Sequence, residues 1–186
     1  MVQIDEQIAA WERSKNTLNF GWDMEALKGG IKKEWLELSD GNRITFATEY
    51  CFAEKIPFIK FEHGDTVSEK REDAIIRINP ESTTIQMLIR LPEDMGNYPL
   101  EVWKDSIKND LKKIGKKTGN FRVEKLEYMD YICYEVCDQN IWTYNLTFRL
   151  HKYDRKIVGN YNCLKSDKST WGLLLEALLL ENYAKL

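Results

Sequence analysis

Strict alternation of apolar and polar side chains over residues 142–150 is the feature that most constrains how this chain can fold. Apolar residues occupy the even positions of this run, and polar or charged residues occupy the odd positions. A two-residue period predicts a β-strand with one buried face. The same period recurs over residues 44–52, 85–91 and 157–163, and a turn sequence occupies residues 39–42. These short runs are typical of antiparallel hairpins and not of βαβ crossovers.

Helical spacing interrupts this strand pattern at three places. In the middle of the chain Pro99 suits the first helical position and Gly115 the end, and one apolar stripe joins them, formed by Leu100, Trp103, Ile107, Leu111 and Ile114. A last helix is predicted to open at Ser166 or Asp167, with a wide apolar face of Trp171, Leu174, Leu175, Leu178 and Leu179. Ile4, Ile8 and Trp11 predict an amphipathic helix near the N-terminus.

The order of these elements predicts an α+β fold, a curved antiparallel sheet covered by amphipathic helices, with an N-terminal helical extension. We expect a single domain over residues 1–186, with residues 1–40 as the extension and 44–183 as the sheet-and-helix core. Residues 19–33 read as an irregular connection with at most a helical turn at 23–28, and residues 63–73 read as a loop. The tryptophans on periodic faces, Trp103, Trp142 and Trp171, are expected in the core.

Composition narrows the class of protein. The 186 residues are 43% hydrophobic and include 27 basic and 30 acidic side chains, which suits a folded domain and is far too acidic for a nucleic-acid-binding one. Residues 1–100 hold 12 basic and 18 acidic side chains, which leaves 15 and 12 for the rest. No apolar run approaches the roughly 18 residues of a membrane span. The acidic start does not resemble a signal peptide, so we expect a cytoplasmic protein.

The four cysteines favour free thiols over disulfides. They are Cys51, Cys133, Cys137 and Cys163, and they form no compact framework. Cys133 and Cys137 lie four apart in a predicted strand, where their Cα atoms would be about 13 Å apart, too far for a disulfide. We expect buried or half-buried thiols in a reducing compartment.

Motifs for catalysis, metals or nucleotides are not found. The chain has only two histidines and neither a Cys-x-x-Cys pair nor a glycine-rich phosphate loop, so no metal or cofactor is expected. Cys163, His151 and Asp154 could in principle form a thiol nucleophile and its base, but the sequence shows no oxyanion element beside them. We therefore predict that the chain is not an enzyme.

Two groups of residues are candidates for binding. Lys112, Lys113, Lys116 and Lys117 form the densest basic run, which fits either a solvated helix face or a docking patch for an acidic partner. Trp22 and Trp35 lie outside the periodic segments, so periodicity does not bury them. If exposed, they would be anchors of a protein-binding surface.

The end of the chain resembles that of PsbP-type domains. The resemblance covers roughly residues 44–183 and lies in the element order, the strand Trp142–His151, the returning strand Ile157–Leu164 and the helix from Thr170. That superfamily includes the Mog-type Ran-binding proteins and several bacterial lipoprotein and secretion-adaptor families. The resemblance implies a non-catalytic protein that binds other proteins. It supplies no site residue for this chain.

Three functions remain open at this point. The first is a non-catalytic cytoplasmic protein-binding module of bacterial character, an adaptor or an immunity-type inhibitor. The alternative is a small-ligand-binding protein or enzyme with a pocket between sheet and helices, lined by Tyr50, Tyr144, Tyr161 and Arg149. Self-association of a structural domain is the third.

Overall fold

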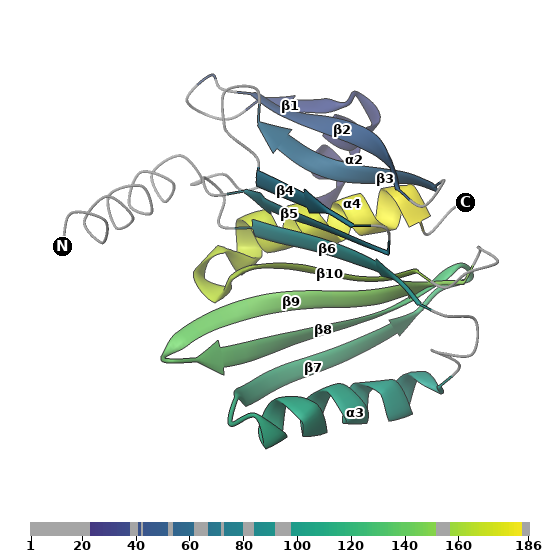
Figure 1. Ribbon diagram of the computed structural model, residues 1–186. Coiled ribbons are helices and arrows are strands. Elements are labelled where there is room, and N and C mark those ends of the chain that lie inside the picture. The colour runs from purple at the N-terminus through teal and green to yellow at the C-terminus, as the bar shows by residue number, and fades with distance from the viewer. Residues whose placement is uncertain are drawn as a thin grey trace.

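Two antiparallel sheets and three helices form the described part of the molecule (Figure 1). The computed structural model describes residues 23–37, 41, 43–51, 54–61, 67–71, 73–79, 84–91, 98–151 and 157–183. The small sheet has the order β1-β2-β3, with bounds Trp35–Glu37, Arg43–Cys51 and Glu54–Phe61. The N-terminal helix predicted around Ile4, Ile8 and Trp11 lies outside the described residues.

The large sheet has seven strands in the order β4-β5-β6-β10-β9-β8-β7, and every neighbouring pair is antiparallel. In that order the bounds are Val67–Lys70, Ala74–Asn79, Thr84–Arg90, Ile157–Leu164, Ile141–Leu150, Met129–Asp138 and Lys117–Lys125. Figure 1 shows the strands bending across the sheet. The predicted α+β class, with a curved antiparallel sheet and covering helices, is confirmed.

Helix α4 (Leu173–Tyr183) covers one face of the large sheet and contributes six side chains to the core. Its buried leucines, Leu174, Leu175, Leu178 and Leu179, belong to the apolar face predicted for the last helix. Phe148 of β9 stacks on Tyr183, with ring centroids 6.1 Å apart, and meets Tyr161 of β10 edge-on at 5.0 Å. No described helix is long and apolar enough to cross a membrane.

Helix α2 (Met24–Lys32) is longer than the single turn that the sequence predicts. Asp23 caps it by accepting a hydrogen bond from the amide of Ala26 at 2.7 Å. Gly30 is buried directly against Leu36, where a Cβ atom would overlap the leucine side chain. Gly30, one of the glycines that suggest an irregular connection, therefore allows close packing within a helix. Leu27 and Ile31 join the core beside α4.

Helix α3 (Leu100–Lys113) lies along β7 on the other face of the large sheet (Figure 1). None of its residues is fully buried. Pro99 is the N-cap residue and not the first helical one, and Gly115 has the positive φ of 76° expected just past a helix end. Ile114, predicted to complete the apolar stripe, is 67% exposed because the helix has already ended there.

Two further expectations change with the structure. Residues 67–70, predicted as loop, form the edge strand β4, whose short polar sequence gives little periodic signal. Residues 121–137 are by sequence long enough for one bent strand or a short hairpin, and in the structure they belong to the hairpin of β7 and β8, in which the register of β7 shifts between Gly119 and Arg122. Trp171 is buried as expected, whereas Trp103 and Trp142 are half-buried.

Candidate functional site

Ile75 and Leu88 enter the core on the α4 face, but strands β5 and β6 otherwise depart from the usual burial of apolar and exposure of polar side chains. Their side chains that point toward the α4 face are buried, yet four of them are polar, namely Arg77, Asn79, Thr84 and Gln86. On the opposite face the same strands carry apolar side chains that are half-buried or, at Ile78, 42% exposed. Buried polar and exposed apolar side chains are the informative exceptions to ordinary burial.

These outward apolar side chains form one continuous surface. Ile76 of β5 is opposite Met87 of β6, and Ile89 of β6 is opposite Val158 of β10. We call this surface the open face and define it by Ile76, Ile78, Ile85, Met87, Ile89 and Val158. No residue of it is fully buried.

Helix α3 covers the other half of the same sheet face, over β7, β8 and β9. There the guanidinium of Arg149 lies over the Trp103 ring, 5.1 Å from its centroid, and donates a hydrogen bond to the carbonyl of Tyr98 at 2.6 Å. Asp130 accepts two hydrogen bonds from Arg149, at 2.6 and 3.0 Å, and lies 3.0 Å from Nε2 of His151. Arg149 is thus a buried, paired side chain that anchors α3.

A polar boundary separates the covered half from the open face. The hydroxyl groups of Tyr134 and Thr147 lie 2.9 Å apart, and Thr147 donates to the amide oxygen of Asn160 at 2.7 Å. Phe121 stacks on Tyr134 with ring centroids 5.2 Å apart. This chain of hydrogen bonds runs across β8, β9 and β10 and ends beside Val158. The open face therefore has an apolar centre and a fixed polar border, which is the usual anatomy of an interface.

A second candidate site lies on the α4 face, between the strands β7 to β9 and the segment that leads into α4. It is a pocket of about 470 Å³, which we call the polar pocket, lined by Asn120, Arg122, Cys133, Tyr144, Lys165, Ser166, Lys168, Ser169, Leu173 and Glu176. A 3-10 turn (Lys165–Asp167) and a π-helical turn (Lys168–Gly172) precede α4 at its rim. Such π turns occur frequently at functional sites.

Glu135 organises the lysine side of the polar pocket. Its carboxylate lies 2.7 Å from the ammonium of Lys165 and 3.4 Å from that of Lys168, and it accepts a hydrogen bond from Asn120 at 2.8 Å. Burial opposes ionisation of this carboxyl, but the hydrogen bonds from Lys165 and Asn120 outweigh that effect, so the pKa of Glu135 lies below its ordinary value.

The opposite side of the pocket is held by Arg122 and Glu176. Arg122 pairs with Glu176, and its guanidinium lies 3.2 Å from the sulfur of Cys133. Tyr131 donates a hydrogen bond to the same Glu176 carboxylate at 3.0 Å. Burial raises the pKa of the Cys133 thiol in spite of the hydrogen bonds from Tyr144 and Arg122. Cys133 is therefore a poor nucleophile in this state.

The binding residues predicted from the sequence do not form one site. Trp35 of β1 is 38% exposed and has the Arg43 guanidinium 4.7 Å above its ring, while Trp22 lies outside the described residues. The basic run spans the end of α3 and the start of β7 with its side chains mostly exposed (Lys112, Lys113, Lys116 and Lys117). Lys113 pairs with Asp110 at 2.9 Å, and Lys116 pairs with Asp138.

The residues predicted to line a pocket also separate. Tyr144 lines the polar pocket, whereas Tyr161 is buried in the core and Arg149 lies on the other face of the sheet. The side chain of Tyr50 lies outside what the structure describes. Cys163 pairs in register with Tyr144, seven residues before His151, so Cys163 and His151 stand about 23 Å apart along the strands. Asp154, the third member of the thiol hypothesis, also lies outside the described residues.

The sequence reasoning missed Lys165, Lys168 and the open face. The two lysines precede the last helix three residues apart, a spacing that brings side chains to the same side of a 3-10 turn. The residues of the open face were recognised as strand, but a two-residue period does not say which face is inner. Among the described residues, no group of three or more His, Cys, Asp or Glu side chains could hold a metal ion.

Comparison with known proteins gives no family. No family model matches the chain, and no curated protein matches it. Among solved structures, a crystal structure of the protein of unknown function PA94 from Pseudomonas aeruginosa is similar over 70% of this chain and 91% of that one, with 6% sequence identity and a TM-score of 0.40. Similarity at this TM-score carries no functional argument. The resemblance to PsbP-type domains stays a prediction.

Proposed function

We propose that this chain is a non-catalytic protein-binding module whose open face receives an apolar segment of its partner. An adaptor or an immunity-type inhibitor in the cytoplasm is the kind of protein that this proposal describes. The observation that carries it is the placement of side chains on β5 and β6, where Arg77 and Gln86 are buried while Ile78 and Met87 are left partly in water.

A strand facing water on one side normally places its apolar side chains inward. Exposed apolar side chains contribute little to the stability of the free protein, but their burial against a partner is worth about 25 cal/mol per Å². Contiguous apolar patches with a polar rim are accordingly a mark of protein interaction sites. Asn160 and Asn162, both half-buried beside the open face, supply that rim.

A photo-crosslinking amino acid at Ile85 tests this proposal in the cells that make the protein. The matched control carries the same amino acid at Asn109, on the exposed side of α3. We expect a discrete adduct with one other protein from position 85 and none from position 109. No adduct from either position, or the same adducts from both, would contradict the proposal. An adduct of twice the mass of the chain would show self-association instead.

A further inference from the structure

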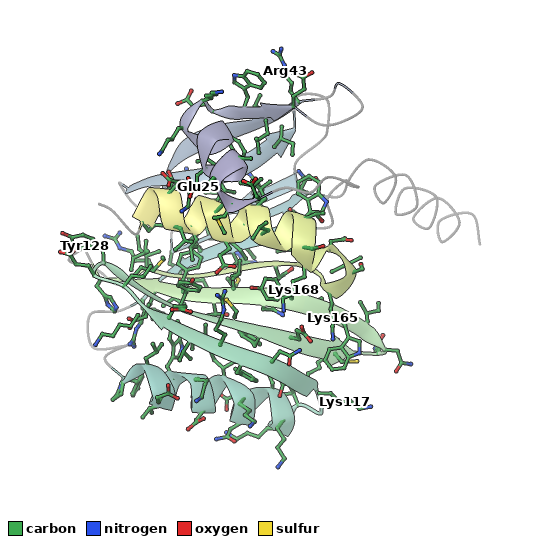
Figure 2. The ribbon with its side chains drawn as sticks, turned by 180° about the vertical axis from the view of Figure 1, so that it is seen from behind. Glu25, Arg43, Lys117, Tyr128, Lys165 and Lys168 are labelled. Atoms are coloured by element: carbon green, nitrogen blue, oxygen red, sulfur yellow. The ribbon has the colours of Figure 1, made fainter. Side chains whose placement is uncertain are left out.

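The polar pocket lies on the opposite face of the sheet from the open face. We propose that it binds an oxyanion group, a carboxylate or a phosphate, between the ammonium groups of Lys165 and Lys168. Figure 2 shows these two lysines together at the start of the segment that leads into α4, in front of the sheet. The site is independent of the proposed function because none of its lining residues belongs to the open face.

The charges around Glu135 do not balance. Two ammonium groups share this one carboxylate, which leaves one positive charge in excess. The Glu135 side chain is 4% exposed, whereas those of Lys165 and Lys168 are 43% and 47% exposed. The excess positive charge is therefore at the mouth of the pocket, where an anion can reach it without displacing Glu135.

Aromatic rings hold both lysines in place. The ammonium of Lys165 lies 4.7 Å from the centroid of the Trp142 ring, and that of Lys168 lies 4.9 Å from the Tyr144 ring. Cation–π contacts and the shared carboxylate restrict both flexible side chains before a ligand arrives. Less conformational entropy is then lost on binding, which favours affinity. Lysine binds carboxylates and phosphates alike, as a point charge.

The far side of the pocket does not repel an anion strongly. The carboxylate of Glu176 is already neutralised by Arg122 and hydrogen-bonded by Tyr131. Glu124 lies 3.7 Å from the same guanidinium, but it is not among the lining residues. Tyr144 and Leu173 give the pocket an apolar wall. A volume of about 470 Å³ is within the range of small-molecule sites, so the oxyanion can belong to a larger ligand.

Titration followed by amide NMR tests the proposal. Inorganic phosphate and acetate are added in separate titrations at an ionic strength held constant with chloride. We expect saturable shifts of the amides of residues 165–169 with at least one of the two anions, and the tighter binder tells phosphate from carboxylate. Shifts that do not saturate with either anion, or that spread evenly over the surface, would overturn the proposal.

Two pairs of variants separate a built site from general surface charge. Lys165→Gln with Lys168→Gln should raise the dissociation constant at least about tenfold, whereas Lys112→Gln with Lys113→Gln, the same change of charge on α3, should leave it within about twofold. Glu135→Gln keeps an oxygen that can accept hydrogen bonds from both lysines but removes a negative charge beside them, so it should tighten binding, while Asp110→Asn should not. Equal effects within each pair would overturn the proposal. Unchanged amide shifts in α2 and α4 report that each variant is folded.

Discussion

At the scale of single residues, Gly159 shows how closely the core of the large sheet is packed. It lies on β10 directly opposite Phe148 of β9, and a Cβ atom added there would overlap the phenylalanine ring. Because that ring is held between Tyr161 and Tyr183, it has no free space to move into. We expect Gly159→Ala to lower the free energy of unfolding by about 1–3 kcal/mol, measured by urea denaturation. The control is Gly119→Ala, where nothing lies within 4 Å of the added atom, and this substitution should change the free energy of unfolding little.

The buried pair of Asp130 and Arg149 gives a second prediction. Asp130→Asn removes the charge that neutralises Arg149 without changing the shape of the side chain, and both side chains are less than a tenth exposed. An uncompensated buried guanidinium should cost about 3–5 kcal/mol of stability. The exposed pair of Lys113 and Asp110 is the comparison, and Asp110→Asn should cost less than about 1 kcal/mol. Similar losses from both substitutions would show that Arg149 is not buried as described.

Glu135 predicts a dependence of stability on pH. Its pKa in the folded protein is below the ordinary value of 4.5, so its ionised form stabilises the fold at neutral pH. This contribution is complete above the pKa of the unfolded chain and is lost as the pH falls through the lower, folded value. We expect Glu135→Gln to destabilise the protein at neutral pH and to have a smaller effect at an acidic pH where the folded Glu135 carboxyl is also protonated. Urea denaturation at both pH values, with Glu101→Gln as an exposed control, measures the difference. A loss that does not change with pH would contradict this role.

At the scale of elements, the three helices differ in how they are held. Helix α4 has six buried residues, whereas α3 has none and depends on half-buried contacts such as Trp103 over Arg149. Elements with few buried apolar contacts open with a lower free energy than the whole molecule. We therefore expect the amides of α3 to exchange with deuterium faster than those of α4. Trp103→Ala should accelerate amide exchange in α3 and leave it unchanged in α4. Equal protection of the two helices would contradict this ranking.

An element is predictable from the sequence when its residues show a clean helical or strand period with an apolar buried face. The strand of residues 142–150 and the last helix were predictable because their periods are clean and their buried faces are apolar. Helix α2 was not, because Gly29 and Gly30 have low helix propensity, and the packing against Leu36 accounts for Gly30 alone. Strand β4 gives almost no periodic signal because it is short and polar. Its pairing with β5 places it in the sheet. The polar pocket is a property of three strands and a helical turn meeting in space, which no local pattern encodes.

At the scale of the whole molecule, the sequence alone does not show which face of β5 and β6 is turned toward the core. Isoleucines and a methionine occupy one face, and the usual rule turns that face inward. The structure turns it outward, because only Ile75 and Leu88 of these two strands enter the core on the α4 face, which β8, β9, β10 and the leucines of α4 complete. The buried polar side chains of β5 and β6, Arg77 and Gln86 among them, lie at its margin. Burying polar side chains and leaving apolar ones partly in water costs stability in the free protein, and this cost points to a role of the open face in binding.

The free protein should tolerate charge on the open face. Ile78→Lys with Met87→Lys should change the free energy of unfolding by less than about 1 kcal/mol, because a lysine there keeps its ammonium in water. Leu88→Lys, at the fully buried neighbouring position of β6, should cost more than about 4 kcal/mol. Urea denaturation compares the two. A loss as large for the double variant as for Leu88→Lys would show that the open face belongs to the core.

The crosslinking yield from Ile85 in that same double variant tests most directly whether the open face receives the partner. The yield is measured in the native cells beside that of the unaltered chain. If the open face is the surface that receives the partner, two charges placed on it should lower the yield at least about tenfold while the protein stays folded. An undiminished yield would mean that the partner is held elsewhere, and the proposed function of the open face would be wrong.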